Sequence, residues 1–333
     1  MMSEWPQVRL HVVTGKGGTG KTTVAAALAL ALASRGQQVL LCEAEGRQGI
    51  ARLFDVPPLP YEERSVAVGS EGGDVYALAI DPEAALLEYL DMYYHLGRAG
   101  RALDRFGVVD FVTTIAPGLR DVLLTGKVYE AYRRRHKDKT PVYDAIVLDA
   151  PPTGRITRFL NVNTEVAGLA KMGPIRNQAD SIMSVLHSAG TAVHLVTLLE
   201  DMPVQETLDA ARELDAIGLQ VGAIIVNQLR TSPLDDVTRK ALGERRLAPP
   251  TLVRALGDAE LPGHGVDVTA QRLAEGLVAG GAEHVERLTL EAGLRETVER
   301  SGRPVSALPL LADDIDLGAL YELAEYLCAQ GLA

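Results

Sequence analysis

Short apolar runs rich in β-branched residues recur along the chain and alternate with longer stretches of helical periodicity. Most of these runs are apolar almost without interruption, which is typical of strands in a parallel sheet covered on both faces. We predict strands at Val8–Val13, Val39–Cys42, Val75–Ile80, Ala145–Asp149, Ala192–Leu198, Val221–Asn227 and Val305–Leu308. Helical patterns lie between them, at Lys21–Arg35, Pro203–Ile217 and Leu317–Gln330. This alternation predicts an α/β fold with a doubly wound, mostly parallel sheet.

Three stretches interrupt the alternation. Pro82–Lys139 and Pro233–Arg303 have helical patterns without a convincing strand, and Val166–His187 is a shorter candidate of the same kind. No Ser/Gly-rich linker or internal repeat divides the chain. We therefore expect one domain over residues 1–333, with a helical subdomain built from insertions at about 82–140, 166–190 and 232–303.

The segment VRLHVVTGKGGTGKTT, residues 8–23, carries the sharpest chemical signal. Gly15, Gly20, Lys21 and Thr22 fit the phosphate-loop pattern, with a predicted strand before them and a helix after them. The glycines let backbone N–H groups turn toward phosphate oxygens, and the helix N-terminus adds its positive end. Lys21 is expected to reach the β- and γ-phosphates, and the Thr22 hydroxyl to bind Mg²⁺. The candidate nucleotide-binding residues are Gly15, Gly17, Gly18, Thr19, Gly20, Lys21, Thr22 and Thr23.

Composition narrows the classes of function. With 33 basic and 44 acidic residues the formal net charge is −11, so no nucleic acid is expected as a partner, because phosphate contacts need a basic surface. The two cysteines, Cys42 and Cys328, are far apart, which argues against a disulfide framework or a zinc ribbon. The longest apolar run, Val24–Ala33, is too short to span a bilayer. We expect a cytoplasmic protein that associates with membranes, if at all, only peripherally.

A second lysine in the loop, Lys16, indicates a family. The string GKGGTGKTT resembles the deviant Walker A phosphate loop of the class that includes cell-division positioning ATPases, partition ATPases, nitrogenase iron protein and arsenical-pump ATPases. This resemblance implies a dimer in which Lys16 reaches the partner's nucleotide. A cation supplied across a dimer would couple its closure to charge stabilisation, as an arginine finger does.

The segment DAPPTGRITRFL, residues 149–160, resembles switch II of the arsenical-pump and tail-anchored-protein-targeting branch of this class. Cell-division and partition relatives lack its Pro-Thr-Gly ending. Asp149 lies at the end of an apolar strand, as a Walker B aspartate does, and is expected to hold Mg²⁺ through water. Gly154 would allow the loop to reorder around a γ-phosphate.

The segment VLLCEAEGRQGIARLF, residues 39–54, resembles switch I of the same branch with a substitution. Glu45 stands where the branch has an aspartate that positions the attacking water, and the Pro-Ala-His that follows becomes Gly46–Gln48. The Glu45 carboxylate is one methylene further out, and such a displacement can lower the rate greatly. Nucleotide binding is therefore better supported than fast hydrolysis.

Two segments later in the chain also resemble this branch, and both resemble parts of its adenine-binding site. The resemblance places Asn227, at the end of a strand, on the adenine, with Pro309 and Leu310 against the base. The likeness runs from Val8 to about Leu327, and 26 Arg against seven Lys favour an actinobacterial-type bacterial member.

The sequence thus predicts a dimeric Mg-ATPase that couples its nucleotide state to a protein or membrane-associated client. The dimer is formed with a second copy or with a paralogous ATPase. The alternative is a weakly hydrolysing, nucleotide-binding regulatory subunit of a heteromeric complex. A positioning ATPase on DNA or membrane is disfavoured by the acidic charge and the switch II string. The apolar stretch Ala84–Gly97 is either core, a partner interface or a groove wall, and the chain has only six methionines for a client groove.

Overall fold

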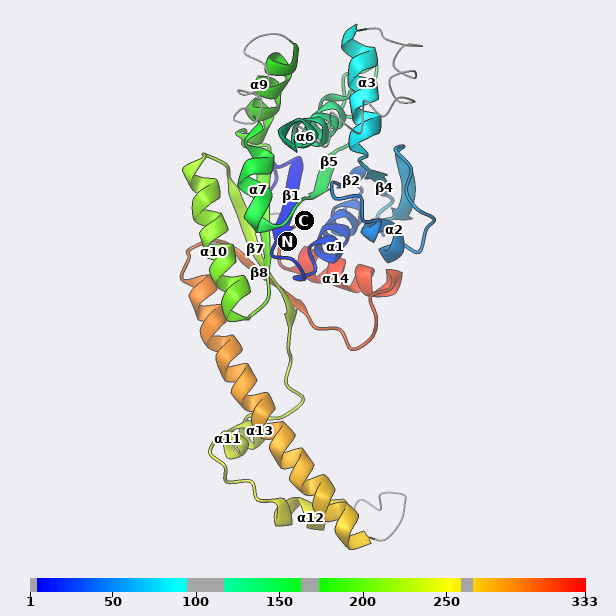
Figure 1. Cartoon of the computed structure of the whole chain (residues 1–333). Helices are drawn as coiled ribbons and strands as arrows, with labels where there is room; N and C mark the ends of the chain where they lie inside the picture. Colours follow the sequence, from blue (N-terminus) through cyan, green and yellow to red (C-terminus); the bar gives the residue numbers. More distant parts are fainter. Residues whose placement is uncertain (1–4, 95–116, 163–173, 259–265) are drawn as a thin grey trace. The chain divides into compact units, whose positions relative to one another are not determined.

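The computed structural model describes residues 5–94, 117–162, 174–258 and 266–333 (Figure 1). It divides into two compact units, one of Met1–Leu229 with Ser301–Ala333 and the other of Arg230–Arg300. The second unit corresponds closely to the third predicted insertion. Residues 95–116, 163–173 and 259–265 lie outside the described residues, and all of them except 163–165 belong to the three predicted insertions. One helical subdomain built from all three insertions therefore stays a prediction.

The larger unit is built on an eight-stranded sheet of order β3-β4-β2-β5-β1-β6-β7-β8. The strands are β1 (Leu10–Gly15), β2 (Val39–Glu43), β3 (Arg64–Val68), β4 (Asp74–Ala79), β5 (Ala145–Asp149), β6 (Thr191–Thr197), β7 (Val221–Leu229) and β8 (Val305–Pro309). All neighbours are parallel except β3 and β4. The predicted doubly wound, mostly parallel fold is confirmed. The sequence pattern missed β3 because this edge strand is short, polar at its start and largely exposed.

Helices cover both faces of this sheet. They are α1 (Lys21–Ala33), α2 (Gly49–Leu53), α3 (Pro82–Tyr94), α6 (Pro117–Arg133), α7 (Thr153–Leu160), α9 (Pro174–Leu186), α10 (Asp201–Ala216) and α14 (Leu317–Ala329). Val13, Leu41 and Val147 face α1 and α14. Leu10 and Leu148 face the opposite layer, which contains α6, α7 and α9.

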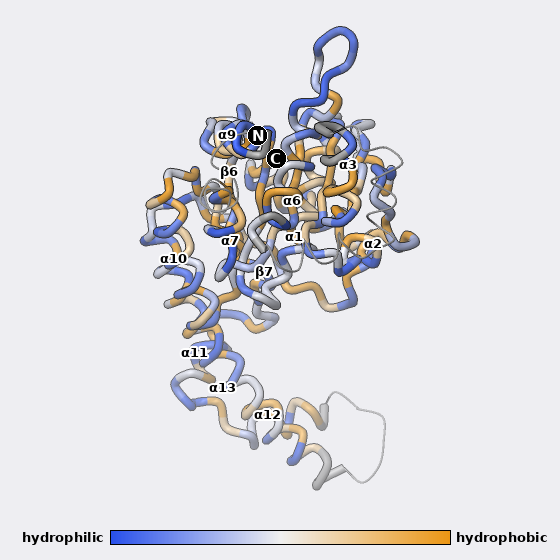
Figure 2. The backbone as a smooth tube through the Cα atoms, turned by 45° about the horizontal axis from the view of Figure 1, so that its top comes forward, coloured by the Kyte–Doolittle hydropathy of each residue, from blue (hydrophilic) through white to orange (hydrophobic). Residues whose placement is uncertain are grey.

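Helix α1 lies at the centre of the core. Every residue from Val24 to Ala33 is at most 4% exposed. A helix that is apolar all round must be buried all round, and its alanines let α14 and the sheet approach closely. The hydrophobic positions of the sheet and α1 form the orange interior of Figure 2. The helix that begins at the phosphate loop is therefore fixed by core packing from its second turn to its end.

The smaller unit contains α11 (Asp236–Gly243), α12 (Pro249–Asp258) and the long α13 (Val266–Glu299). Asp235 caps α11 by accepting a hydrogen bond from the Thr238 N–H at 2.7 Å. Gly281 allows α11 and α13 to approach, because a Cβ there would lie 2.9 Å from a methyl group of Leu242. Two leucines one turn apart on α13, Leu273 and Leu277, are 41% and 50% exposed.

In the described part of the chain, no helix combines the length and the apolar character needed to cross a bilayer. The apolar stretch predicted at Ala84–Gly97 begins inside α3, and its last three residues lie outside the described range. Ala85 and Leu86 are each 6% exposed. Burial of both side chains favours core packing for the start of this stretch.

Two histidines from adjacent strands form a buried pair. The His11 and His194 rings are stacked with 5.3 Å between centroids, and His11 Nδ1 lies 3.1 Å from His194 Nε2. The Ala223 N–H donates to His194 Nδ1 at 3.1 Å, so Nε2 of His194 carries the proton shared with His11. Burial lowers the pKa of His11 to about 4 and that of His194 well below its usual value.

This pair makes folding stability sensitive to acid. Between pH 6.5 and about 4 the unfolded His11 imidazole binds a proton and the folded one does not, so stability falls as pH decreases. We expect the free energy of unfolding of wild type, relative to His11→Leu, to fall by about 2 kcal/mol between pH 7 and pH 4.5. Urea denaturation of both proteins across this range measures the difference.

His136→Gln is the matched control because His136 is exposed. Its difference from wild type should stay nearly constant over the same range. A wild-type curve parallel to that of His11→Leu would contradict a neutral, buried His11.

Candidate nucleotide-binding site

The predicted site residues meet at the carboxyl edge of the central strands. In the sheet register Asp149 of β5 lies beside both Val13 of β1 and Glu43 of β2. The phosphate loop follows β1 directly, and β5 and β6 flank β1 on its two sides. Open α/β sheets bind their ligands at this edge, where the strand order reverses.

The phosphate loop depends on glycine at particular positions. Gly20 has φ of 84°, in the left-handed region, and a Cβ there would lie 2.4 Å from the Asn227 side-chain nitrogen. Gly15 is confined differently, because a Cβ would lie 2.2 Å from the Val196 carbonyl oxygen. Within the loop Thr19 Oγ1 donates to the Lys16 carbonyl at 2.9 Å. These contacts hold the turn that carries the chain from β1 into α1.

The first residues of α1 contact the Walker B aspartate directly. Thr22 Oγ1 donates to Asp149 Oδ2 at 2.7 Å. Lys21 is 9% exposed and Asp149 is 7% exposed. The second carboxylate oxygen, Asp149 Oδ1, is buried without a hydrogen-bond partner. The structure thus brings together the lysine, hydroxyl and carboxylate that the sequence assigned to Mg-ATP.

Sequence reasoning missed Glu43, the last residue of β2. It is 2% exposed, its Oε1 accepts a hydrogen bond from the Gly49 N–H at 3.1 Å, and its Oε2 is buried without a partner. The apolar strand was predicted to end at Cys42, one residue too early. An acid at the end of an apolar strand was the available signal, as it was for Asp149.

The ionisation of Asp149 is disfavoured in this site. The pKa of Asp149 is raised to about 7, chiefly by burial; the Thr22 hydrogen bond and Lys21 oppose the rise, and the charges of Glu43 and Glu45 add to it. A buried carboxylate oxygen without a partner is costly. Two such oxygens beside a threonine hydroxyl are hard oxygen donors, which fit Mg²⁺. In the described chain, no group of three or more His, Cys, Asp or Glu side chains is arranged to hold a metal by itself.

The switch I segment is held by its own side chains. The Arg47 guanidinium lies 3.5 Å from Glu45 Oε2, and the Glu45 side chain is 19% exposed. The Gln48 side chain makes two hydrogen bonds with the backbone of Leu59, at 2.7 and 3.1 Å. Glu45 therefore lies close enough to raise the pKa of Asp149, but its carboxylate is paired with Arg47.

Switch II is tied to β1 and to α10. Thr14 Oγ1 donates to the Pro151 carbonyl at 2.6 Å, and Thr153 Oγ1 donates to Glu206 Oε1 at 2.6 Å. Glu206 on α10 was not foreseen, because its role depends on tertiary contacts. Gly154 is exposed, and a Cβ at this position would meet nothing within 4 Å. This conformation therefore imposes no steric need for glycine there.

The residues predicted for adenine lie near the loop. Asn227 is 6% exposed, and its Nδ2 donates to the Thr19 carbonyl at 2.9 Å. Pro309 pairs with Leu229 between β8 and β7, and the Leu310 N–H donates to the Leu229 carbonyl. Leu310 is 46% exposed. Asn227 therefore supports the phosphate loop here, and its contact with adenine stays a prediction, as do those of Pro309 and Leu310.

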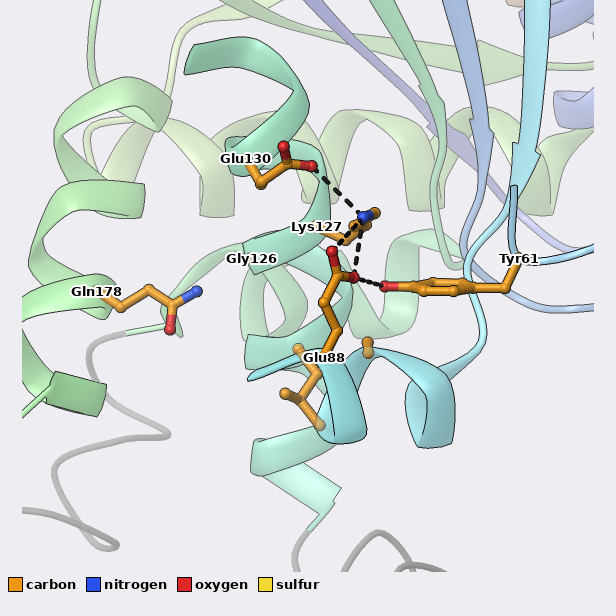
Figure 3. Close-up of a pocket in the computed structure, with 8 residues that line it drawn as sticks. Tyr61, Glu88, Gly126, Lys127, Glu130 and Gln178 are labelled. Atoms are coloured by element: carbon orange, nitrogen blue, oxygen red, sulfur yellow. Dashed lines mark hydrogen bonds and ion pairs between the residues drawn. The ribbon is translucent and has the colours of Figure 1, made fainter. Parts of the chain in front are cut away.

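A separate charged cavity lies between α3, α6 and α9 (Figure 3). Lys127 Nζ lies 2.9 Å from both Glu88 oxygens and 3.4 Å from Glu130. The Tyr61 hydroxyl donates to Glu88 Oε2 at 2.6 Å. The cavity has about 40 Å³ of space for water. The charged side chains that line this cavity are paired with one another, so their role is to link the helices. The phosphate-loop site remains the candidate for chemistry.

The sheet order, the phosphate loop after β1 and the Thr22–Asp149 contact define a P-loop nucleotide-binding fold. The profile of the family described as anion-transporting ATPase matches residues 8–190. The chain belongs to this family and is an ATPase, which confirms the family that the sequence resembles.

Individual relatives support the assignment. The ATPase BagA of Mycobacterium tuberculosis is 52% identical over 98% of this chain and 96% of its own length. ATPase GET3 of Kluyveromyces lactis is 27% identical over 67% of this chain and 73% of its own. The arsenical pump-driving ATPase of Escherichia coli is 28% identical over 70% of this chain and 42% of its own. The mycobacterial likeness agrees with the predicted actinobacterial type.

The buried carboxylate pair predicts a gain in stability from Asp149→Asn. The unfolded carboxyl ionises near pH 3.8 and the folded one near pH 7, so the stability of wild type falls as pH rises through this window. Without metal or nucleotide, the free energy of unfolding of Asp149→Asn relative to wild type should rise by at most about 4 kcal/mol from pH 4 to pH 8. Denaturant titration in EDTA measures it.

Glu322→Gln serves as the control because Glu322 is exposed on α14. Its free energy of unfolding should differ from that of wild type by the same amount at both pH values. If the difference in stability between Asp149→Asn and wild type were the same at pH 4 and pH 8, the fold would not raise the pKa of Asp149.

Proposed function

We propose that this ATPase is a dimeric switch that binds Mg-ATP, hydrolyses it slowly and couples its nucleotide state to a protein or membrane-associated client. The observation that carries the proposal is the Thr22–Asp149 hydrogen bond, which joins the phosphate loop to the strand that leads into switch II. Loss or gain of a γ-phosphate next to this bond would be felt by both segments.

The residues around this bond have distinct roles in the proposal. The loop N–H groups and Lys21 bind the phosphates, with Lys21 balancing charge on the transferred group. The Thr22 hydroxyl, Asp149 and Glu43 hold Mg²⁺, the carboxylates directly or through water. Bound Mg²⁺ supplies charge neutralisation at the phosphate oxygens. Glu45 positions the attacking water, and Gly154 lets switch II reorder.

Dimerisation and client binding are the less local parts of the proposal. The deviant loop supports a dimer in which Lys16 acts on the nucleotide of the partner, either a second copy or a paralogous ATPase. The exposed leucines of α13, Leu273 and Leu277, offer apolar contact area to a client. The names of the relatives, ATPase GET3 and arsenical pump-driving ATPase, support ATP hydrolysis by a chain of this kind. A cytoplasmic location is part of the proposal, and no nucleic acid is proposed as a partner.

Lys21→Ala is expected to lower Mg-ATP turnover at least about 100-fold, because the buried ammonium is the cation that α1 supplies to the phosphates. Phosphate release by the purified protein is the measurement. Lys240→Ala, at an exposed lysine of α11, should retain turnover. If Lys21→Ala turns over ATP like wild type while remaining folded, the site assignment is wrong.

A second candidate function is a nucleotide-binding regulatory subunit paired with an active paralogue. Glu45 favours it, because its carboxylate is one methylene longer than the aspartate of the branch and is paired with Arg47 at 3.5 Å. A chain of this kind would bind Mg-ATP tightly and leave most hydrolysis to its partner.

Glu45→Asp tests the water-positioning role and separates the two candidates. Shortening the side chain should raise kcat on the order of tenfold with KM unchanged, since only the position of the water changes. A gain much larger than this would favour the regulatory subunit. Glu71→Asp, at an exposed glutamate, is the control. An unchanged kcat would show that Glu45 does not position the attacking water.

A further inference from the structure

One carboxylate contacts both the signature lysine and switch II. Glu206, in the second turn of α10, has its Oε2 3.3 Å from the Lys16 ammonium nitrogen. Its other oxygen, Oε1, accepts the 2.6 Å hydrogen bond from Thr153 at the start of α7. A single side chain thereby joins the phosphate loop, α7 and α10.

The two contacts differ in strength. The Lys16 and Glu206 side chains are each 32% exposed, and an ion pair at this exposure shifts an equilibrium by a factor of about five at most. Thr153 is 2% exposed, and its short hydrogen bond to an ionised carboxylate is of the stronger kind. A competing anion would therefore remove Lys16 from Glu206 while Glu206 stays on Thr153.

A nucleoside triphosphate is such an anion, because its terminal phosphate has more charge and more acceptor oxygens than one carboxylate. Lys16 cannot hold a phosphate and Glu206 together unless both anions lie within reach of one ammonium group. In this conformation, Glu206 is the anion that is paired with Lys16.

We propose that Glu206 is a positioning residue that retains Lys16 in its own subunit until a terminal phosphate displaces it. Release of Lys16 leaves the Oε2 side of Glu206 without its cation, while Oε1 keeps switch II attached to α10. The inference rests on the proposed function, in which Lys16 acts on nucleotide. It adds a step at which the triphosphate is distinguished from the diphosphate as the subunits close.

The test is a double-mutant cycle with Glu206→Gln and Lys16→Gln. Glutamine keeps an oxygen for Thr153 and removes the charge that holds Lys16. The Kd values of Mg-ATPγS and Mg-ADP are measured on the whole chain by competition with a fluorescent nucleotide. We expect Glu206→Gln to tighten ATPγS binding about threefold and ADP binding less, and to change neither in the Lys16→Gln background.

Two further variants control for structure. Thr153→Val removes the switch II hydrogen bond and leaves the Lys16 pair, so it should not reproduce the gain for ATPγS. Glu213→Gln, at an exposed glutamate further along α10, should bind both nucleotides like wild type. Thermal melts establish that each variant is folded.

The inference is overturned if Glu206→Gln gives no gain, if the gain persists in the Lys16→Gln background, or if Thr153→Val reproduces it. Failure of the proposed function has a different signature. In that case Lys21→Ala binds Mg-ATPγS as tightly as wild type, whatever the result of the cycle.

Discussion

Two acidic side chains, Asp149 and Glu43, are buried side by side at the carboxyl ends of adjacent parallel strands. Each uses one oxygen inside the protein, on Thr22 or on the Gly49 N–H, and each has a second oxygen without a partner. Such a pair disfavours folding unless a cation joins it. The fold holds this arrangement because the two strands are fixed on both faces by apolar packing, and α1 is buried from Val24 to Ala33. A loss of stability at this edge of the sheet is compatible with the proposed binding of Mg-nucleotide there.

The connections of this edge explain how a local charge can act at a distance. The start of α1 reaches β5 through Thr22, β1 reaches switch II through Thr14, and the phosphate loop reaches α10 through Lys16 and Glu206. Each is a single hydrogen bond or ion pair, so each can change without unfolding the sheet. Switch I is held by a different set, in which Gln48 bridges to Leu59. The strands that carry the nucleotide site are thus held by core packing, while single hydrogen bonds and ion pairs around the site can change, as the proposed switch requires.

Much of this could be predicted from the sequence because the signals are contiguous. The phosphate loop and the segment from Asp149 to Gly154 each place several functional residues within a few positions, and apolar runs marked seven of the eight strands. The sequence analysis missed Glu43 because only the pairing register of β2 and β5 places it beside Asp149. The sequence analysis missed Glu206 because it is 53 residues from Thr153 in sequence. A glutamate on a helix also usually faces solvent, so its position gave no signal. Edge strand β3 has only three apolar residues, after a polar start, which is too short a run to mark a strand.

Binding of Mn²⁺ in the presence of ADP, followed by electron paramagnetic resonance, tests the cation site most directly. Mn²⁺ replaces Mg²⁺ at oxygen ligands and reports its own free concentration. The account predicts that Glu43→Gln weakens Mn²⁺ binding on the order of tenfold, while the affinity for ADP without metal is unchanged. Mn²⁺ binding by Glu43→Gln that equals wild type would contradict it, because the orphaned oxygen of Glu43 would then play no part in holding the cation.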